Sequence, residues 1–139
     1  MRLYSITGKL INRSMNKYYI DWDKPSRSQF QFKIKQFLKQ YWRTHVVTEE
    51  FPVYGTRLKV DFINFTKRIA IEVNGSQHSK FNSFFHNNSR LDYLKSIKRD
   101  VKKAEWLEMN SIKLIEVEEE DLKSLSVEHF INVCGISIV

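Results

Sequence analysis

Two acidic residues interrupt apolar, strand-like stretches in the middle of the chain. Asp61 lies in "RLKVDFINF" (57–65), and Glu72 lies in "RIAIEVN" (68–74). Because successive residues of a strand point to opposite faces, a hairpin of these two stretches can project both carboxylates from one side. Two such groups without partners would repel each other and lose hydration. A divalent cation would remove both penalties, and Mg²⁺ prefers oxygen ligands of this kind.

A turn with further polar groups follows Glu72. It reads "NGSQH" and places Asn74, Gln77 and His78 just beyond the second acid. Histidine has a reference pKa of about 6.5, so His78 could act as an acid or a base near neutral pH. Readings without a cation also stay open. Each acid could be exposed on an edge strand or paired with a lysine such as Lys59, and His78 could be a solvated turn residue.

The elements that must position these groups alternate between strands and helices. The hydrophobic pattern predicts a hairpin in the first 22 residues, with "RLYSIT" and "NKYYIDW" as its strands. Ser28 is a predicted N-cap, and Gln31 follows it at capping-box spacing. The remaining pattern predicts helices within 24–42, 89–109 and 119–133 and strands at 44–53, 57–65, 68–74 and 112–117.

This order of elements favours an α/β fold with a mixed central sheet flanked by helices and an N-terminal β-hairpin. The chain of 139 residues suits a single domain. It divides into a hairpin (1–24), a core (26–122) and a C-terminal helix and tail (123–139). In the long helix, apolar residues recur at three- and four-residue steps, which predicts a buried stripe made of Leu91, Leu94, Ile97, Val101, Ala104 and Leu107.

The overall charge favours an anionic partner. The chain carries a net charge of +7 and has a pI near 9.5, so nucleic acid is the first expectation and an acidic membrane surface the second. One cysteine, Cys134, excludes an internal disulfide and a cysteine-rich zinc site. No apolar run is long enough to span a membrane, and the first residues lack a signal-peptide block. We therefore expect an intracellular, cytoplasmic protein.

The ordered motifs resemble the PD-(D/E)xK nuclease superfamily. They are strand "VDF", a turn, strand "IEVNGSQH", and then "KRDVKKAEWLEMNSIKLIEV". Within the superfamily, the pattern is most similar to the branch of very-short-patch-repair endonucleases and phage homing endonucleases. The resemblance covers about residues 26–122. It implies a restriction-endonuclease-like fold and a phage-encoded or mobile-element origin.

The resemblance also implies a site. Asp61 and Glu72 match the two metal-binding acids, and the Val73 carbonyl would be a third ligand for Mg²⁺, for which Mn²⁺ should substitute. His78 matches the histidine of the family's "G..H" segment. Asp100, in the "RD..K" part of the long helix, would be an active-site or supporting residue, although an intrahelical pair with Lys103 is the simpler account.

Three positions depart from the family pattern, and the mildest is Val60, which stands before Asp61 where the family pattern has a proline that is frequently lost. The acid that the family carries near the start of its first helix falls on Gln31, and the lysine of its E-x-K motif falls on Asn74. Gln31 could be catalytic or serve only the helix start. Either Glu49 or Glu50, with Glu50 favoured, could point into the site and replace the missing acid.

Contacts with nucleic acid are expected around the site. We predict contacts from Asn74, Lys80, His86, Arg99 and Lys103, with Gln77 as a further phosphate-binding residue. Basic residues on two helices could line a channel for phosphates, or simply form the charged outer faces of these helices. They are Lys33, Lys35, Lys39, Arg43, Lys95, Lys98, Arg99, Lys102 and Lys103.

The resulting hypothesis is a Mg²⁺-dependent endonuclease that hydrolyses phosphodiester bonds in double-stranded or branched DNA. A monomer would make nicks, branched-DNA cuts or homing-type cuts, and a homodimer could cut both strands. The alternative is a nuclease-like domain without catalysis that binds DNA or a protein partner. An RNA-directed nuclease is a third reading.

Overall fold

A four-stranded mixed sheet forms the centre of the structure, a computed structural model that describes residues 1–74 and 90–139. Its order is β3 (Val47–Pro52), β4 (Lys59–Asn64), β5 (Ile69–Asn74) and β6 (Lys113–Glu118). The pairs β3–β4 and β4–β5 are antiparallel, whereas β6 runs parallel to β5. A parallel pair needs a crossover connection, and helix α3 (Arg90–Met109) provides it.

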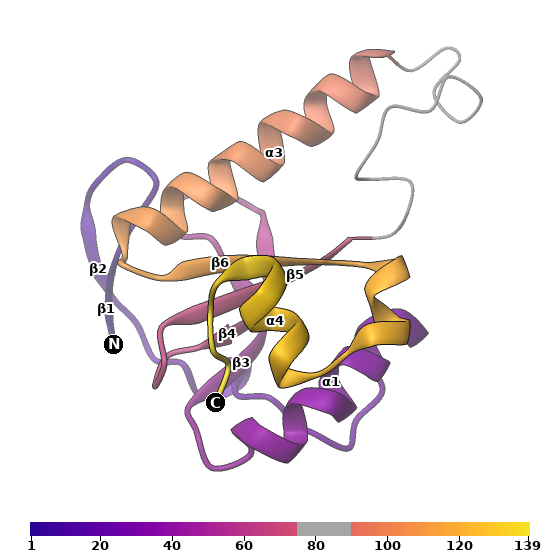
Figure 1. Ribbon diagram of the computed structural model, residues 1–139. Helices are drawn as coiled ribbons and strands as arrows, with labels where there is room; N and C mark the ends of the chain where they lie inside the picture. The colour runs from indigo at the N-terminus through magenta and orange to yellow at the C-terminus, as the bar shows by residue number, and fades with distance from the viewer. Residues whose placement is uncertain (75–89) are drawn as a thin grey trace.

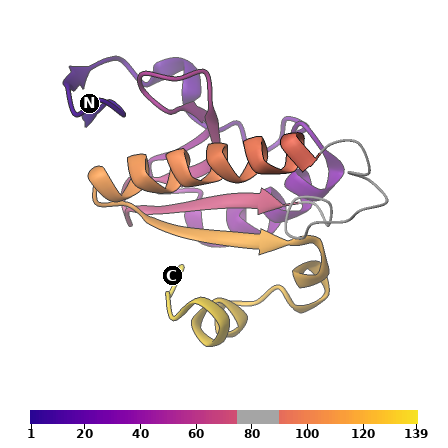
Figure 2. The same ribbon diagram turned by 90° about the horizontal axis from the view of Figure 1, so that it is seen from above.

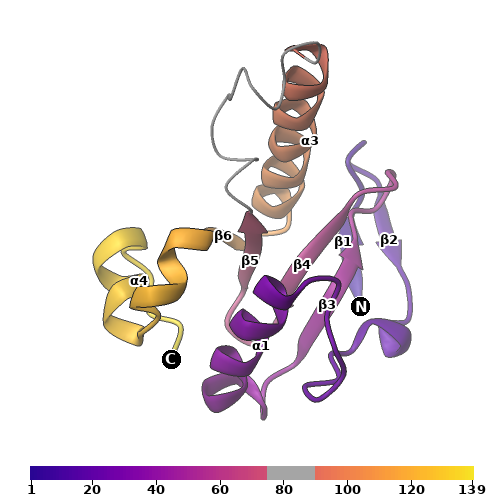
Figure 3. The same ribbon diagram turned by 90° about the vertical axis from the view of Figure 1, so that its right-hand side faces the viewer.

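Helices cover both faces of this sheet. Figure 1 shows α3 on one side, with α1 (Gln29–Trp42) and α4 (Val127–Cys134) on the other. Figure 3 shows the same division from the side. Two apolar clusters fill the layers: one joins the sheet to the end of α3, and the other joins it to α1 and α4. The predicted mixed sheet flanked by helices is therefore confirmed.

Helix α1 is fixed to the sheet at its start and along one side. Ser28 is its N-cap, and the Ser28 hydroxyl accepts a hydrogen bond of 3.1 Å from the Gln31 amide N–H, as predicted. Ile34, Leu38 and Trp42 lie on one side of the helix and are buried against the sheet. Because α1 begins at the end of the sheet where β3 and β5 finish, its first turn lies beside the acidic residues.

The N-terminal hairpin is present, but the prediction of its second strand was wrong. It consists of β1 (Arg2–Tyr4) and β2 (Leu10–Asn12). A tight turn between them has Gly8 at a φ of +86° and a hydrogen bond from the Ser5 N–H to the Lys9 carbonyl. This turn pairs β1 with the residues that immediately follow. The stretch expected as the second strand instead contains a 3₁₀ turn, η1 (Asn16–Tyr18).

The predicted closing helix is broken into two pieces. A 3₁₀ segment, η2 (Glu119–Ser124), is followed by extended residues and then by α4. The Ser126 hydroxyl accepts a hydrogen bond from the His129 N–H and so starts a new helix at that point. The prediction missed this internal N-cap.

Helix α3 packs against the sheet mainly through its last turns. Trp106 and Leu107 are fully buried, whereas Leu94, Ile97 and Val101 are 41–55% exposed. Figures 1 and 3 show the first part of α3 rising away from the sheet. The prediction of a continuous buried stripe was therefore wrong for these three residues, because the helix is longer than the part of the sheet that it covers.

The two leucines of α3 test this arrangement. We expect Leu107→Ala to lower the free energy of unfolding by about 2–5 kcal/mol, because it leaves a cavity in the core. The control Leu94→Ala should change it by less than about 0.5 kcal/mol, because that side chain is exposed. Urea denaturation followed by circular dichroism measures both values. Equal losses would contradict the partial docking of α3.

Candidate active site

The sheet places one acidic residue of every strand in a row. The row is Glu50, Asp61, Glu72 and Glu116. Glu72 and Glu116 are direct partners of the parallel pair β5–β6. Continuing the registers of the neighbouring pairs sets Glu50 opposite Asp61, and Asp61 opposite Glu72. The sequence prediction included the two central acids and favoured Glu50. Glu116 lies on the strand predicted at 112–117, but the sequence prediction gave it no role in the site.

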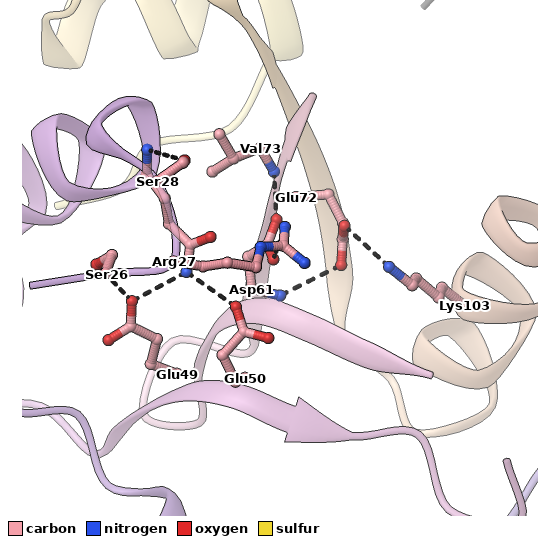
Figure 4. Close-up of polar contacts among 10 residues, drawn as sticks. Ser26, Arg27, Ser28, Glu49, Glu50, Asp61, Glu72, Val73 and Lys103 are labelled. Atoms are coloured by element: carbon pink, nitrogen blue, oxygen red, sulfur yellow. Dashed lines mark hydrogen bonds and ion pairs between the residues drawn. The ribbon is translucent and has the colours of Figure 1, made fainter. Parts of the chain in front are cut away.

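Asp61 and Glu72 lie side by side in the interior. Their exposed fractions are 2% and 8%. One Asp61 carboxylate oxygen accepts a hydrogen bond of 2.8 Å from the Val73 N–H, and one Glu72 carboxylate oxygen accepts a longer one, 3.3 Å, from the Asp61 N–H. Figure 4 shows both side chains at this point of the sheet. Alternation along two strands thus brings the acids together as the sequence suggested.

Burial makes the charged forms of these acids unfavourable. Loss of hydration, followed by the negative charge of Asp61, raises the pKa of Glu72 to about 8. Loss of hydration also raises the pKa of Asp61, and the nearby charge of Glu50 adds to this rise. At neutral pH the Asp61–Glu72 pair therefore favours holding a proton or a cation.

Two basic side chains reach the acids from other elements. Lys103 Nζ of α3 lies 3.3 Å from a Glu72 carboxylate oxygen, and Arg27 Nη2 lies 3.4 Å from an Asp61 carboxylate oxygen. The Arg27 side chain is 66% exposed, so solvent weakens its pairing. Lys59, the partner considered from sequence, makes no ion pair among residues 1–74 and 90–139, although it lies nearby.

These residues line one cleft of about 630 Å³. Its lining includes Glu50, Glu72, Val73 and Asn74 at the ends of the strands. It is also lined by five basic residues, namely Arg27, Arg57, Lys59, Arg99 and Lys103. Asp61 lies beneath the surface, against Glu72. The cleft therefore combines four acidic residues, Glu50, Glu72, Asp100 and Glu119, with these five basic residues, which we call the basic rim. This mixture of charges is suited to a cation and a phosphate.

The sequence analysis did not identify two of these five basic residues as candidate site residues. Arg27 precedes α1 and lies 34 positions from its partner, Asp61. Arg57 lies in the turn before β4 and belongs to no motif. Neither residue carries a periodic or motif signal, so only the folded chain brings them to the cleft.

Gln31 contacts acidic side chains as well as the helix start. Its side-chain amide is buried and donates hydrogen bonds of 2.9 Å to Glu49 and 3.1 Å to Glu50. The reading that Gln31 serves only the start of α1 was therefore wrong. Its carbonyl oxygen Oε1 has no hydrogen-bond partner among the described residues.

Two of the basic residues predicted on α1 form ion pairs with acidic residues of the same chain. Lys35 is buried, and its Nζ lies 2.8 Å from a Glu49 carboxylate oxygen. Lys39 pairs with Asp23 at 2.8 Å. Lys35 therefore neither lines a phosphate channel nor belongs to an exposed outer face, whereas Lys39 lies in a surface ion pair. Their charges are compensated by acids that the sequence pattern did not connect to α1.

Other predicted site residues are placed as follows. Asn74 lines the cleft and donates a weak hydrogen bond of 3.5 Å to Glu118. Asp100 also lines the cleft, and no ion pair joins it to Lys103. Its charge adds to the burial that raises the pKa of Glu116. Gln77, His78, Lys80 and His86 lie outside the described residues.

The donor set of the site suits a hard divalent cation. Two carboxylates and the Val73 carbonyl are oxygen ligands, and the raised pKa values of both acids indicate that their charges are poorly compensated. Within residues 1–74 and 90–139, no group of three or more His, Cys, Asp or Glu side chains is arranged to hold a metal ion. The fit therefore rests on a pair of acids.

Comparisons with known proteins leave the family open. No protein-family model matches the chain, and no solved structure matches it. Uncharacterized protein 033L of Invertebrate iridescent virus 3 is 38% identical over 66 residues. This match covers 48% of the present chain and 34% of the viral protein, so the chain spans about a third of that relative. In the described part of the chain, no helix is long and apolar enough to cross a membrane.

The buried acids predict an unusual dependence of stability on pH. Glu72 has a pKa of about 8 when folded and an ordinary value of 4.5 when unfolded. Between these values the folded chain keeps a proton that the unfolded chain has released. The free energy of unfolding should therefore fall, by on the order of a few kcal/mol, as the pH rises through this window in EDTA.

Glu72→Gln tests the origin of this slope. The amide can still accept the Asp61 N–H but does not ionise, so we expect a flatter profile and higher stability than wild type at pH 8. Denaturation curves at pH 5, 6, 7 and 8 measure the effect. The exposed control Glu108→Gln should keep the wild-type slope. A wild-type slope in Glu72→Gln would show that another group carries the effect.

Proposed function

We propose that this protein is a Mg²⁺-dependent endonuclease acting on DNA, with a restriction-endonuclease-like arrangement of the sheet and helices. The observation that carries the proposal is the buried pair of Asp61 and Glu72, of which Glu72 lines a cleft together with five basic residues. A pair of poorly compensated acids provides a reason to bind a cation, and the basic rim provides a reason to bind a polyanion.

Each group has a chemical role in this proposal. Asp61, Glu72 and the Val73 carbonyl would hold the cation, with Mn²⁺ as a substitute for Mg²⁺. When bound, the cation supplies Lewis-acid stabilisation of the phosphate and activation of water. Arg99 and Lys103 line the cleft, where they can pair with phosphate oxygens and neutralise charge that develops during hydrolysis.

The missing E-x-K lysine has a candidate replacement. Asn74 stands at that position and has no charge, but Lys103 extends its ammonium group from α3 to within 3.3 Å of Glu72. This location would let Lys103 stabilise charge close to the cation. The general acid or base assigned from sequence is His78, with Gln77 beside it, and both remain proposals from the sequence alone.

The substrate proposal is double-stranded or branched DNA, with Asn74, Lys80 and His86 as additional contacts. A single site per chain would cut one strand, and a homodimer would allow cleavage of both. Similarity to a viral protein agrees with a virus- or phage-encoded enzyme that acts inside a host cell. That relative is itself uncharacterised, so it adds no activity to the proposal.

A second candidate function is a domain that binds DNA without cutting it. The ion pairs of Arg27 with Asp61 and of Lys103 with Glu72 favour this reading, because they offset part of the acidic charge without a metal. The amides at positions 31 and 74 favour it as well. Both functions predict salt-sensitive DNA binding, and only the first predicts metal-dependent cleavage.

Cleavage assays separate these functions. We expect wild-type protein with Mg²⁺ or Mn²⁺ to nick supercoiled plasmid or cut a branched duplex, and EDTA to abolish this activity. Asp61→Asn and Glu72→Gln should each reduce the rate by more than about 100-fold, because each removes a cation ligand. The control Glu108→Gln should cut at the wild-type rate.

Two outcomes of this assay would change the proposal. Metal-independent binding without any cleavage would support the binding-only domain. Faster cleavage of a matched RNA than of the DNA would shift the substrate class to RNA.

The basic rim predicts the strength of DNA binding. We expect Arg99→Ala to weaken binding of a duplex at moderate salt and to lower the slope of log K against log salt by about one, because one phosphate contact is lost. The control Lys113→Ala, at the opposite end of β6, should leave the slope unchanged. Fluorescence anisotropy at several salt concentrations measures both. An unchanged slope in Arg99→Ala would place the DNA elsewhere.

A further inference from the structure

Arg27 extends into the cleft from an anchored piece of backbone. The Ser26 hydroxyl donates a hydrogen bond of 2.7 Å to Glu49, and the Ser28 hydroxyl caps α1. Between these two anchors, the Arg27 side chain is 66% exposed. Figure 4 shows it reaching from the segment before α1 toward Asp61. An exposed side chain keeps much of its rotamer freedom, so the guanidinium can reach more than one partner from the same position.

The ion pair between Arg27 and Asp61 is incomplete. It contains one hydrogen bond, 3.4 Å long, from Arg27 Nη2 to Asp61 Oδ1. A strong guanidinium–carboxylate pair has two parallel bonds of about 2.7–2.9 Å. The other Asp61 oxygen, Oδ2, is already occupied by the Val73 N–H at 2.8 Å. A cation could therefore take the place of Arg27 at Oδ1 without breaking a strong bond.

Glu50 adds negative charge close to this pair. Its backbone has a φ of +55°, in the left-handed region that residues other than glycine rarely adopt, and Glu50 lines the same cleft as Arg27. The positive charge of Arg27 and the negative charge of Glu50 act on Asp61 in opposite directions. Arg27 is thus a partial counter-ion of Asp61, in a position where a divalent cation would be a stronger one.

The second ion pair of the site is less suited to exchange. Lys103 Nζ lies 3.3 Å from a Glu72 oxygen, and the Lys103 side chain is 18% exposed. It extends from α3 and has little freedom to turn toward solvent. Of the two basic side chains that contact the acids, Arg27 is therefore the one that can leave its partner.

We propose that Arg27 is the counter-ion of Asp61 when no cation is bound, and that a bound cation displaces it so that its guanidinium binds a phosphate of the DNA. This inference rests on the proposed function of Asp61 and Glu72 as cation ligands. A guanidinium can donate two parallel hydrogen bonds to a phosphate. The cation and the DNA thus strengthen each other's binding through Arg27, and this coupling is reciprocal.

Removal of Arg27 should change cation binding and DNA binding in opposite directions. In isothermal titration calorimetry without DNA, we expect Arg27→Ala to bind Mn²⁺ at least about threefold more tightly than wild type, because no guanidinium competes for Asp61. The side chain is exposed, so the variant should fold as wild type does, which circular dichroism checks.

Fluorescence anisotropy measures the effect on DNA binding. The probe is a duplex with phosphorothioate linkages, which resist hydrolysis. With Mn²⁺ present, Arg27→Ala should bind this duplex at least about fivefold more weakly than wild type, because a phosphate contact is lost. In EDTA the loss should be less than about twofold, because the wild-type guanidinium is then engaged with Asp61.

Lys59→Ala is the matched control. It removes one positive charge from the same cleft, but within residues 1–74 and 90–139 Lys59 makes no ion pair with either acid. Its Mn²⁺ affinity should differ from that of wild type by less than about 1.5-fold. Its effect on DNA binding should be the same with Mn²⁺ and with EDTA. Asp61→Asn should lose Mn²⁺ binding and serves as the reference for a cation ligand.

The outcomes separate this inference from the function on which it rests. If wild type binds Mn²⁺ and Asp61→Asn does not, while Arg27→Ala binds as wild type does or more weakly, Arg27 does not compete with the cation and the proposed function stands. Equal losses of DNA affinity in Mn²⁺ and EDTA would show that the cation does not release Arg27. If wild type itself does not bind Mn²⁺, both the cation site and the exchange of Arg27 are wrong.

Discussion

The burial of two like-charged side chains on neighbouring strands is the constraint on which the rest of this structure depends. An isolated buried carboxylate costs several kcal/mol, and a second one beside it adds repulsion. The contacts that Asp61 and Glu72 make offset only part of this cost, because Arg27 is largely exposed and both ion pairs are 3.3 Å or longer. A fold without a use for these acids would gain stability from apolar residues at the same positions. Their presence is the main reason to assign this end of the sheet a chemical role.

The topology explains why the acids converge at one end of the sheet. Strands β3, β5 and β6 all finish there, and β4 begins there. Helix α1 also starts at this end, and α3 passes over it (Figure 2). Residues at the start of α1 and residues of β3, β4, β5, α3 and the 3₁₀ segment η2 line the cleft. Each contributes only one to a few of the residues that line it, so the site depends on correct docking of both helices rather than on any single motif.

Charge compensation is divided between two layers of the molecule. On the α1 side, the buried Lys35 neutralises Glu49, so that acid is satisfied without a ligand. On the α3 side, Lys103 contacts Glu72, and Asp100 adds negative charge near Glu116. Adjacent glutamates on β3 thus have different roles. Glu49 belongs to the structural ion pair beneath α1, whereas Glu50 faces the cleft.

The sequence by itself determined the secondary structure of the core and the pair of acids at its centre. Period-two alternation fixed the faces of β4 and β5, and this local rule was sufficient to place Asp61 next to Glu72. The tertiary structure alone decided which basic side chains reach the two acids and which of two adjacent glutamates lines the cleft. It also decided how much of α3 packs against the sheet. These features depend on contacts between residues far apart in the chain, such as Arg27 with Asp61, and on one backbone angle at Glu50. Neither a long-range contact nor a single backbone angle produces a periodic pattern in the sequence.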